Sequence, residues 1–121
     1  MNEEKITING VDYIREDAIN ERAEELDGMQ YVMCRTYSAG VFCGYLASRE
    51  GKEVVLKNAR RIWYWEGAAS LSQLAMEGTS KPKNCKFPCE VDEVTLTEAI
   101  EIIPMTQKAK ESIASVEVWA E

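Results

Sequence analysis

The stretch that decides the fold is QYVMCRTYSAGVFCGYLASREGKEVVLKNARRIWYW, residues 30–65. It holds three runs rich in β-branched and aromatic residues, separated by short links that each contain a glycine. The runs are 30–36, 41–49 and 53–65, and the links are 37–40 and 50–52. Strands joined by such short links pair antiparallel, so the stretch predicts a three-stranded meander. Asn58-Ala59 inside the third run predicts a β-bulge, which would re-aim the flanking side chains.

Upstream of this stretch the pattern predicts a hairpin followed by a helix. Residues 6–14 alternate apolar and polar side chains around Asn9-Gly10, the strongest short signal for a type I′ turn. From Arg15 to Asp27 the apolar residues recur at helical spacing among acids, which is typical of an amphipathic helix. These residues are Ala18, Ile19, Ala23 and Leu26. Gly28 is a suitable end for that helix.

Downstream the predicted elements are shorter. Ser70 and Gln73 have the spacing of a capping box, which would begin a helix that Gly78 ends. The remaining predictions are a short edge strand at 85–89, a strand at 94–103 stopped by Pro104, a helix at 106–115 and a final strand at 116–119. The acidic residues Glu90, Asp92 and Glu93 fall in a turn-like segment, where we expect them to be solvated.

The length of 121 residues indicates one domain. We predict an α+β fold: a mainly antiparallel β-sheet with an N-terminal amphipathic helix and one or two short helices. Residues 1–28 would form the hairpin and the helix, and residues 29–121 the β-rich core.

Composition excludes several classes of function. The chain has no histidine, which removes the commonest general base and every Ser-His or Cys-His dyad. Its net charge of −7 disfavours long nucleic acids and anionic membranes. No apolar run approaches the length of a membrane span, and the acidic N-terminus leads us to expect no signal peptide.

The four cysteines are Cys34, Cys43, Cys85 and Cys89. Their spacings, C-x8-C and C-x3-C, include no C-x2-C knuckle, and no histidine is present to complete a mixed zinc site. Without a signal peptide a disulfide framework is also unexpected. We therefore expect free thiols, with Cys34 and Cys43 buried in strands, and neither a metal nor a cofactor.

Positive charge is collected in the middle of the chain. Residues 28–65 carry a net charge of +4, whereas residues 1–27 carry −6 and residues 66–121 carry −5. Segregation of charge on solvated strands would produce this pattern. A locally cationic segment would also suit a small anion.

Three features that favour such an anion follow one another between residues 57 and 73. Cationic side chains come first, then aromatic rings on which a base or ribose can stack, and then a helix N-terminus preceded by small residues. The candidate ligand-binding residues are Arg35, Lys57, Asn58, Arg60, Arg61, Trp63, Trp65, Ser70, Gln73 and Phe87. We expect the guanidinium groups and indole rings among them to line one shared cavity. No catalytic residue is predicted.

Structural alternatives exist for each of these candidates. Trp63 and Trp65 could be core residues or a dimer contact, and Ser70 could be only a helix cap. Phe87 could be plain packing. Arg60 and Arg61 point to opposite faces of a regular strand, so at least one of them could be solvated or paired with an acid.

Residues 32–42, 51–75 and 96–104 resemble a family of small phage and prophage proteins of unknown function, and through it the anti-Thoeris sponge proteins of phages. The resemblance covers roughly residues 29–118. It implies a protein of the host bacterial cytosol that binds a cyclic ADP-ribose isomer, an immune signal, and holds it without cleavage. It also implies a homo-oligomer, a dimer or an assembly of dimers, with the ligand between protomers; some such proteins also capture cyclic oligonucleotides.

The leading hypothesis is therefore a sequestering protein that is not an enzyme. The alternative is a phage structural or protein-interaction module in which Trp63, Trp65 and Trp119 form the partner surface. A nucleotide-processing enzyme with Asp92 or Glu93 as its base has weaker support, because no feature of the sequence favours bond breaking.

Overall fold

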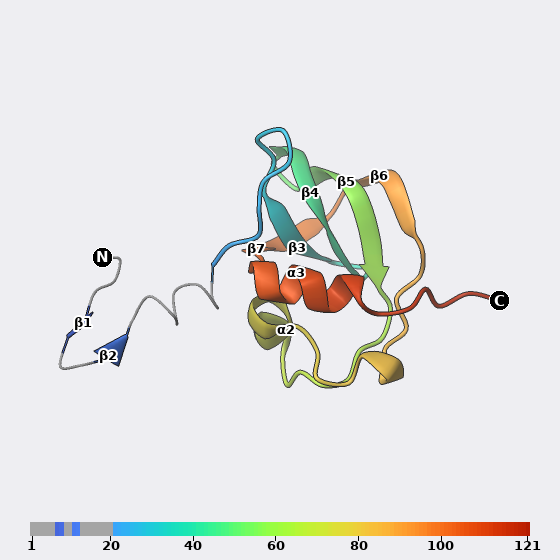
Figure 1. Cartoon of the computed structure of the whole chain (residues 1–121). Helices are drawn as coiled ribbons and strands as arrows, with labels where there is room; N and C mark the ends of the chain where they lie inside the picture. The colour runs from blue at the N-terminus through green and yellow to red at the C-terminus, as the bar shows by residue number, and fades with distance from the viewer. Residues whose placement is uncertain (1–6, 9–10, 13–20) are drawn as a thin grey trace.

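Five antiparallel strands form the main sheet (Figure 1). The computed structural model describes residues 7–8, 11–12 and 21–121. The strands are β3 (Tyr31–Thr36), β4 (Val41–Glu50), β5 (Glu53–Ile62), β6 (Glu90–Leu96) and β7 (Ala99–Pro104), in the order β6-β5-β4-β3-β7. β3, β4 and β5 confirm the meander predicted from residues 30–65. A separate hairpin of β1 (Thr7–Ile8) and β2 (Val11–Asp12) confirms the predicted strand pairing there, while Asn9 and Gly10 lie outside the described residues.

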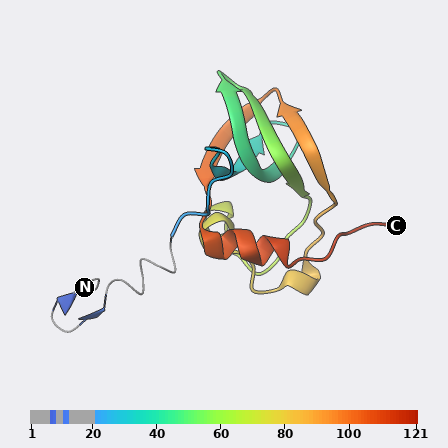
Figure 2. The same cartoon turned by 45° about the horizontal axis from the view of Figure 1, so that its top comes forward.

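The main sheet is strongly curled because its two edge strands are consecutive in the chain (Figure 2). β6 and β7 lie at opposite ends of the strand order, yet only Thr97 and Glu98 separate them. The Tyr37 N–H donates to the Glu98 carbonyl oxygen (2.9 Å), and the Ala99 N–H donates to the Lys52 carbonyl oxygen (3.0 Å). These bonds tie the connecting turn to the loops on either side of β4.

Each side of the sheet packs a separate apolar cluster. The cluster inside the curl draws residues from both edge strands; its buried members are Val32, Cys34, Phe42, Val54, Leu56, Ala59 and Leu96. The other cluster lies between the sheet and two helices, α2 (Leu71–Glu77) and α3 (Gln107–Ala114), which lie together on one side of it (Figure 1). Its largest fully buried members are Met33, Leu74, Phe87, Met105 and Ile113. Neither of these helices has the length and apolarity that crossing a membrane requires.

Side chains cap both described helices, and Ser70 and Gly78 bound α2 as predicted. The N–H of Gln73 donates to Ser70 Oγ (3.1 Å), and Gly78 ends α2 with a φ of 79°. The N–H of Ala109 donates to Thr106 Oγ1 (3.0 Å) at the start of α3. Cys34 and Cys43 are buried free thiols, as predicted, and burial raises the pKa of both.

Several predicted elements are wrong. The third strand ends at Ile62, not Trp65. The strand predicted at 94–103 is two strands, β6 and β7, because the chain turns at 97–98. The Glu90–Asp92–Glu93 segment, predicted as a turn, is the first half of β6 and pairs with β5.

Three further predicted elements differ. Residues 85–89 and 116–119 form isolated bridges rather than strands, among them Phe87 with Val118. A short 3-10 turn, η1 (Pro82–Asn84), precedes the first of these segments. Residues 21–27 are not helical, and Arg22 bridges Thr106 there; the rest of the predicted N-terminal helix, residues 15–20, lies outside the described residues.

The bulge predicted at Asn58-Ala59 is present. Cys43 pairs with Arg60 but Tyr45 pairs with Lys57, so β5 has one extra residue at this point. Asn58 takes it up with a φ of 51°, in the left-handed region that asparagine tolerates better than most residues.

Arg60 ties the sheet to the segments packed on it. Its guanidinium donates to four carbonyl oxygens: Pro88 (from Nε, 3.0 Å), Ile113 (from Nη1, 2.8 Å), Phe87 (from Nη2, 3.2 Å) and Val116 (from Nη2, 2.8 Å). The side chain also lies 5.5 Å over the Phe87 ring, and the residue is only 8% exposed. One side chain therefore joins β5 to the chain before β6, the end of α3 and the C-terminal tail, which we define as residues 116–121.

We expect Asn58→Val to lower the free energy of unfolding by about 1–2 kcal/mol, the cost of a left-handed conformation for a side chain that resists it. Asn58→Gly should leave that free energy unchanged or raise it. Urea denaturation measures both, and Lys57→Val at the preceding, half-exposed position is the control. A valine variant as stable as the wild type would contradict the bulge.

Arg60→Met should lower the free energy of unfolding by about 3 kcal/mol or more, because it leaves buried carbonyl groups without donors. Arg60→Lys should recover only part of this, since an ammonium cannot reach four acceptors spread over three segments. Arg61→Met is the matched control and should cost about 1 kcal/mol or less. Equal losses for the two methionine variants in chemical denaturation would show that Arg60 has no such role.

Candidate functional site

A hollow of about 400 Å³ lies between the sheet and α3. Residues from β3, β4, β5, β6, α3 and the C-terminal tail line it. They are Tyr31, Tyr45, Asn58, Arg60, Glu90, Lys110, Ile113, Ala114, Val116 and Val118. We call this hollow the tyrosine cavity. Its volume lies within the range of small-molecule sites, about 300–1,000 Å³.

Two tyrosines give the cavity its aromatic wall. The rings of Tyr31 and Tyr45 pack edge to face, with their centroids 5.0 Å apart. Each residue is 9% exposed, and among the described residues neither hydroxyl has a hydrogen-bond partner. Burial, with smaller contributions from Cys43, Glu90 and Tyr45, raises the pKa of Tyr31 far above its usual value, so this hydroxyl stays protonated. Tyrosine hydroxyls usually have a hydrogen-bond partner, so both phenols, which have none among the described residues, are available to a ligand or to water.

Two cations face the same space. The Nζ atom of Lys110 lies 5.4 Å from the Tyr31 ring centroid and 5.3 Å from that of Tyr45. The Arg60 guanidinium uses four of its five N–H groups on carbonyl oxygens, and no carboxylate among the described residues forms an ion pair with it. Buried arginines are usually paired with an acid. Carbonyl dipoles therefore make the direct contacts with this positive charge, while Glu90, its partner across the β5–β6 ladder, acts on it from beyond ion-pair distance.

Glu90 and Asn58 complete the polar lining. Two cations against one carboxylate leave the cavity net positive in a chain of net charge −7. The cavity can therefore accept an anionic group between Lys110, Arg60 and the phenols. The Glu90 carboxylate and the Asn58 amide can bind hydroxyl or amine groups.

Of the ten candidate ligand-binding residues, the structure brings only Asn58 and Arg60 into this cavity. Arg35 is exposed, and its Nε donates to Glu101 Oε1 (2.8 Å). Lys57 is half-exposed and pairs with Glu93 (3.8 Å). Arg61 points away from Arg60, as strand alternation requires, donates to the Ala39 carbonyl oxygen (2.5 Å) and lies 4.3 Å over the Phe42 ring.

The aromatic candidates lie in three different environments. Trp63 is 61% exposed and stacks on Trp119. Trp65 is half-buried, packs against the helix-side cluster and donates from Nε1 to the Ala68 carbonyl oxygen (3.3 Å). Phe87 is fully buried beneath Arg60. The expectation that guanidinium groups and indole rings line one cavity is therefore wrong. β5 ends before Trp63, and successive side chains along β5, such as Arg60 and Arg61, point to opposite faces of the sheet.

The N-terminus of α2 is already used by the protein. Ser70 accepts from the N–H of Gln73, and Gln73 Oε1 accepts from the N–H of Ala69 (2.7 Å). The loop 79–81 packs directly on Gly67, where a Cβ atom would come within 2.5 Å of the Lys81 nitrogen. The small residues before the helix therefore admit a neighbouring loop, not a ligand.

Sequence reasoning missed Tyr31, Tyr45, Lys110 and the part that Glu90 plays in the site. The two tyrosines gave a weak signal, since they lie on neighbouring predicted strands. Lys110 gave none, because its helix reaches the sheet only through tertiary packing. No three acids or cysteines among the described residues cluster in a way that would hold a metal ion.

The comparisons with known proteins give one match. The model of a family described as a domain of unknown function, DUF6948, matches residues 29–113. This range spans the sheet and nearly all of α3, and it includes the two tyrosines, Arg60, Glu90 and Lys110. No curated protein and no solved structure matches the chain. Because the match covers more than two thirds of its length, the chain belongs to the DUF6948 family, whose function is unknown.

Proposed function

We propose that the chain binds a small, anionic, ring-bearing molecule in the tyrosine cavity and holds it without cleaving it. One observation carries the proposal: two phenol groups that have no hydrogen-bond partner among the described residues line the same hollow as a buried guanidinium and the Lys110 ammonium. Glu90 is the one carboxylate in that lining, so the two cations outnumber it. The resemblance to anti-Thoeris sponge proteins makes a cyclic ADP-ribose-type signal the candidate ligand. The protein would then be a phage anti-defence sponge of the host cytosol.

The physical argument rests on polar groups of the cavity that lack hydrogen bonds among the described residues. Burying a polar group without a hydrogen bond costs about 1–3 kcal/mol, and a ligand that supplies the bond recovers part of that cost. A phosphate oxygen can accept from Lys110, from the unused N–H on Arg60 Nη1 and from either phenol. Ribose hydroxyls can donate to Glu90.

The size of the cavity adds a condition. At about 400 Å³ it lies near the lower end of ligand pockets, and it is open to solvent rather than enclosed. A sponge needs tight binding, about −12 kcal/mol at nanomolar affinity, and that requires a well-enclosed ligand. A cyclic dinucleotide-sized molecule would therefore need a further wall, which a second protomer can supply.

We expect calorimetry to detect binding of at least one cyclic ADP-ribose isomer. Heat release from the complex should return the ligand unchanged. Lys110→Gln should weaken binding about tenfold, the effect of one charge-assisted contact. Lys108→Gln, on the exposed side of the same helix, should leave affinity unchanged. Recovery of a cleaved product would mean an enzyme, whereas no binding of any cyclic nucleotide would favour the protein-interaction alternative.

Tyr31→Phe separates ligand binding from stability. It should weaken ligand binding roughly threefold to tenfold, because it removes one donor, yet leave the neutral-pH stability unchanged or higher, because it removes an unpartnered buried hydroxyl. A large loss of stability at neutral pH would mean that the hydroxyl has a structural partner.

The same variant should change the alkaline response. The folded state keeps Tyr31 protonated, whereas the unfolded state ionises it above its usual pKa of 10.0. The stabilising contribution of the protonated form is complete below that pH and is lost as the pH rises beyond it. Unfolding measured from pH 9 to pH 11.5 should show a steeper loss in the wild type than in Tyr31→Phe. Cys43, whose pKa is also raised, contributes equally to both proteins.

A further inference from the structure

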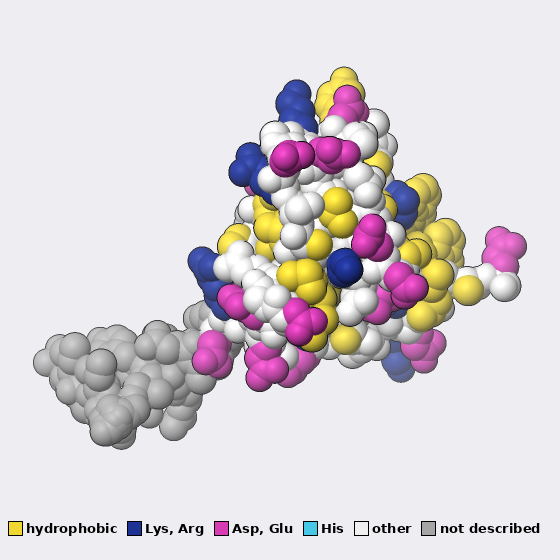
Figure 3. All heavy atoms as spheres, turned by 90° about the horizontal axis from the view of Figure 1, so that it is seen from above, with side chains coloured by type: hydrophobic (Ala, Val, Ile, Leu, Met, Phe, Trp, Pro, Cys, Tyr) yellow, Lys and Arg dark blue, Asp and Glu magenta, His cyan; other side chains and the backbone are white. Residues whose placement is uncertain are grey.

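A second surface, which shares only Val118 with the tyrosine cavity, exposes large apolar side chains. We call it the aromatic patch and define it as Trp63, Tyr64, Val118 and Trp119, which are 61%, 44%, 55% and 45% exposed. The Trp63 and Trp119 rings stack with centroids 6.2 Å apart and planes 14° apart. Lys86 Nζ lies 5.9 Å from the Tyr64 ring centroid and 5.7 Å from that of Trp119. Figure 3 shows apolar side chains gathered on the side where the C-terminal tail leaves the domain.

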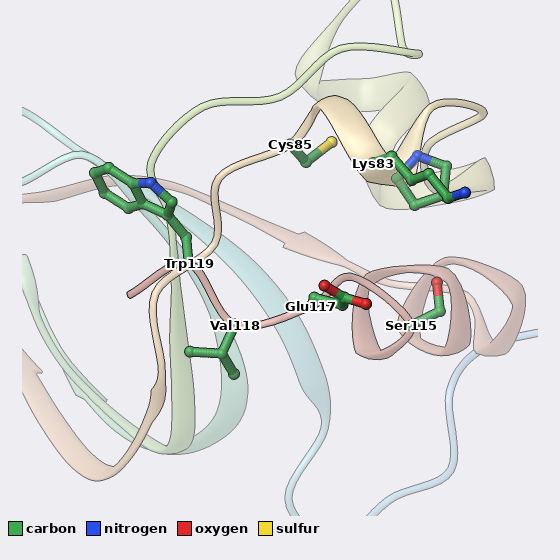
Figure 4. Close-up of a pocket in the computed structure, with 7 residues that line it drawn as sticks. Lys83, Cys85, Ser115, Glu117, Val118 and Trp119 are labelled. Atoms are coloured by element: carbon green, nitrogen blue, oxygen red, sulfur yellow. The ribbon is translucent and has the colours of Figure 1, made fainter. Parts of the chain in front are cut away.

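A hollow of about 630 Å³ adjoins the patch (Figure 4). It lies between η1 and the C-terminal tail, with Lys83 on the η1 side and Glu117 on the tail side. Trp119 and Val118 form part of its wall, so the patch continues into the hollow.

The rim of this surface carries both signs of charge. On the η1 side, Lys81, Lys83 and Lys86 outnumber one acid, Glu66. The Glu66 carboxylate accepts from the Tyr64 hydroxyl (2.6 Å) and from Asn84 Nδ2 (3.0 Å). On the tail side lie Glu117 and Glu121, with no basic residue after Lys110. Exposed tryptophan and tyrosine surrounded by charged residues are typical of the centre and rim of a protein interface.

We infer that the aromatic patch binds a second copy of this chain about a two-fold axis. A two-fold interface brings the same surface of both copies together, so the surface must complement itself. Here the lysine side of one copy would lie against the glutamate side of the other, with the indoles between them. A chain of net charge −7 repels its copies over most of its surface, and this mixed rim relieves the repulsion.

The charge pattern also argues against other occupants. Glu117 stands inside the hollow, which disfavours an acidic peptide or a nucleic-acid strand along the lysines. This inference does not rest on the proposed ligand, since none of the cations of the tyrosine cavity takes part.

Sedimentation of the full chain over a wide concentration range tests the interface. We expect a reversible dimer. Trp63→Ser should raise its dissociation constant about tenfold or more, because tryptophans at interface centres contribute much of the binding energy. Tyr37→Ser is the control, since Tyr37 is 77% exposed in the β3–β4 turn, away from the patch. A wild type that stays monomeric throughout, or a dimer insensitive to Trp63→Ser, would overturn the inference. A monomer that instead retains an acidic peptide would do the same.

Charge reversal tests the two-fold arrangement directly. Lys83→Glu alone and Glu117→Lys alone should each weaken self-association, because each places like charges across the interface twice. Mixing the two single variants should restore association, since both contacts then join opposite charges between copies. A mixture that associates no more tightly than either variant alone would overturn the two-fold pairing. A contact between Lys83 and Glu117 within one chain cannot produce this recovery, because each chain in the mixture carries only one of the two changes.

Discussion

The domain depends on the guanidinium of Arg60 and its hydrogen bonds to carbonyl oxygens of Phe87, Pro88, Ile113 and Val116. These carbonyls belong to the entry to β6, the end of α3 and the C-terminal tail, none of which is continuous with β5. No regular strand pairing connects the tail to the sheet. A planar group with five donors is the side chain best suited to join backbone segments that lack a ladder of their own.

The sequence predicted those parts of the fold that local chemistry decides. The meander followed from short glycine-containing links, the bulge from Asn58-Ala59, α2 from its Ser70 cap, and α3 from the helix predicted at 106–115. Prediction from the sequence failed where contacts between distant segments determine the structure. The turn at Thr97-Glu98 carries no glycine or proline, and it exists because β7 pairs with β3 more than sixty residues away. Residues 116–119 have the pattern of a strand, but among the described residues they form only one β-bridge, Phe87 with Val118, and one hydrogen bond from Arg60 to the Val116 carbonyl oxygen.

The candidate site shows the same division. Residues 57–65 hold many groups that suit a nucleotide, but neighbours along a strand point to opposite sides, and the strand ends before its indoles. Only Asn58 and Arg60 therefore reach the tyrosine cavity. Its other polar groups come from four further elements, so no single window of sequence contains them. The sequence therefore placed two residues of β5 in the candidate site but none of the residues that the other elements contribute.

The stacked indoles of Trp63 and Trp119 make the position of the C-terminal tail measurable by tryptophan fluorescence. The chain has three tryptophans, and two of them form this stack, one on the domain and one on the tail. Val118, beside the stack, also lines the tyrosine cavity. Intrinsic fluorescence thus reports where the tail lies, without any attached dye, and an occupant on either side of the tail should alter the emission spectrum.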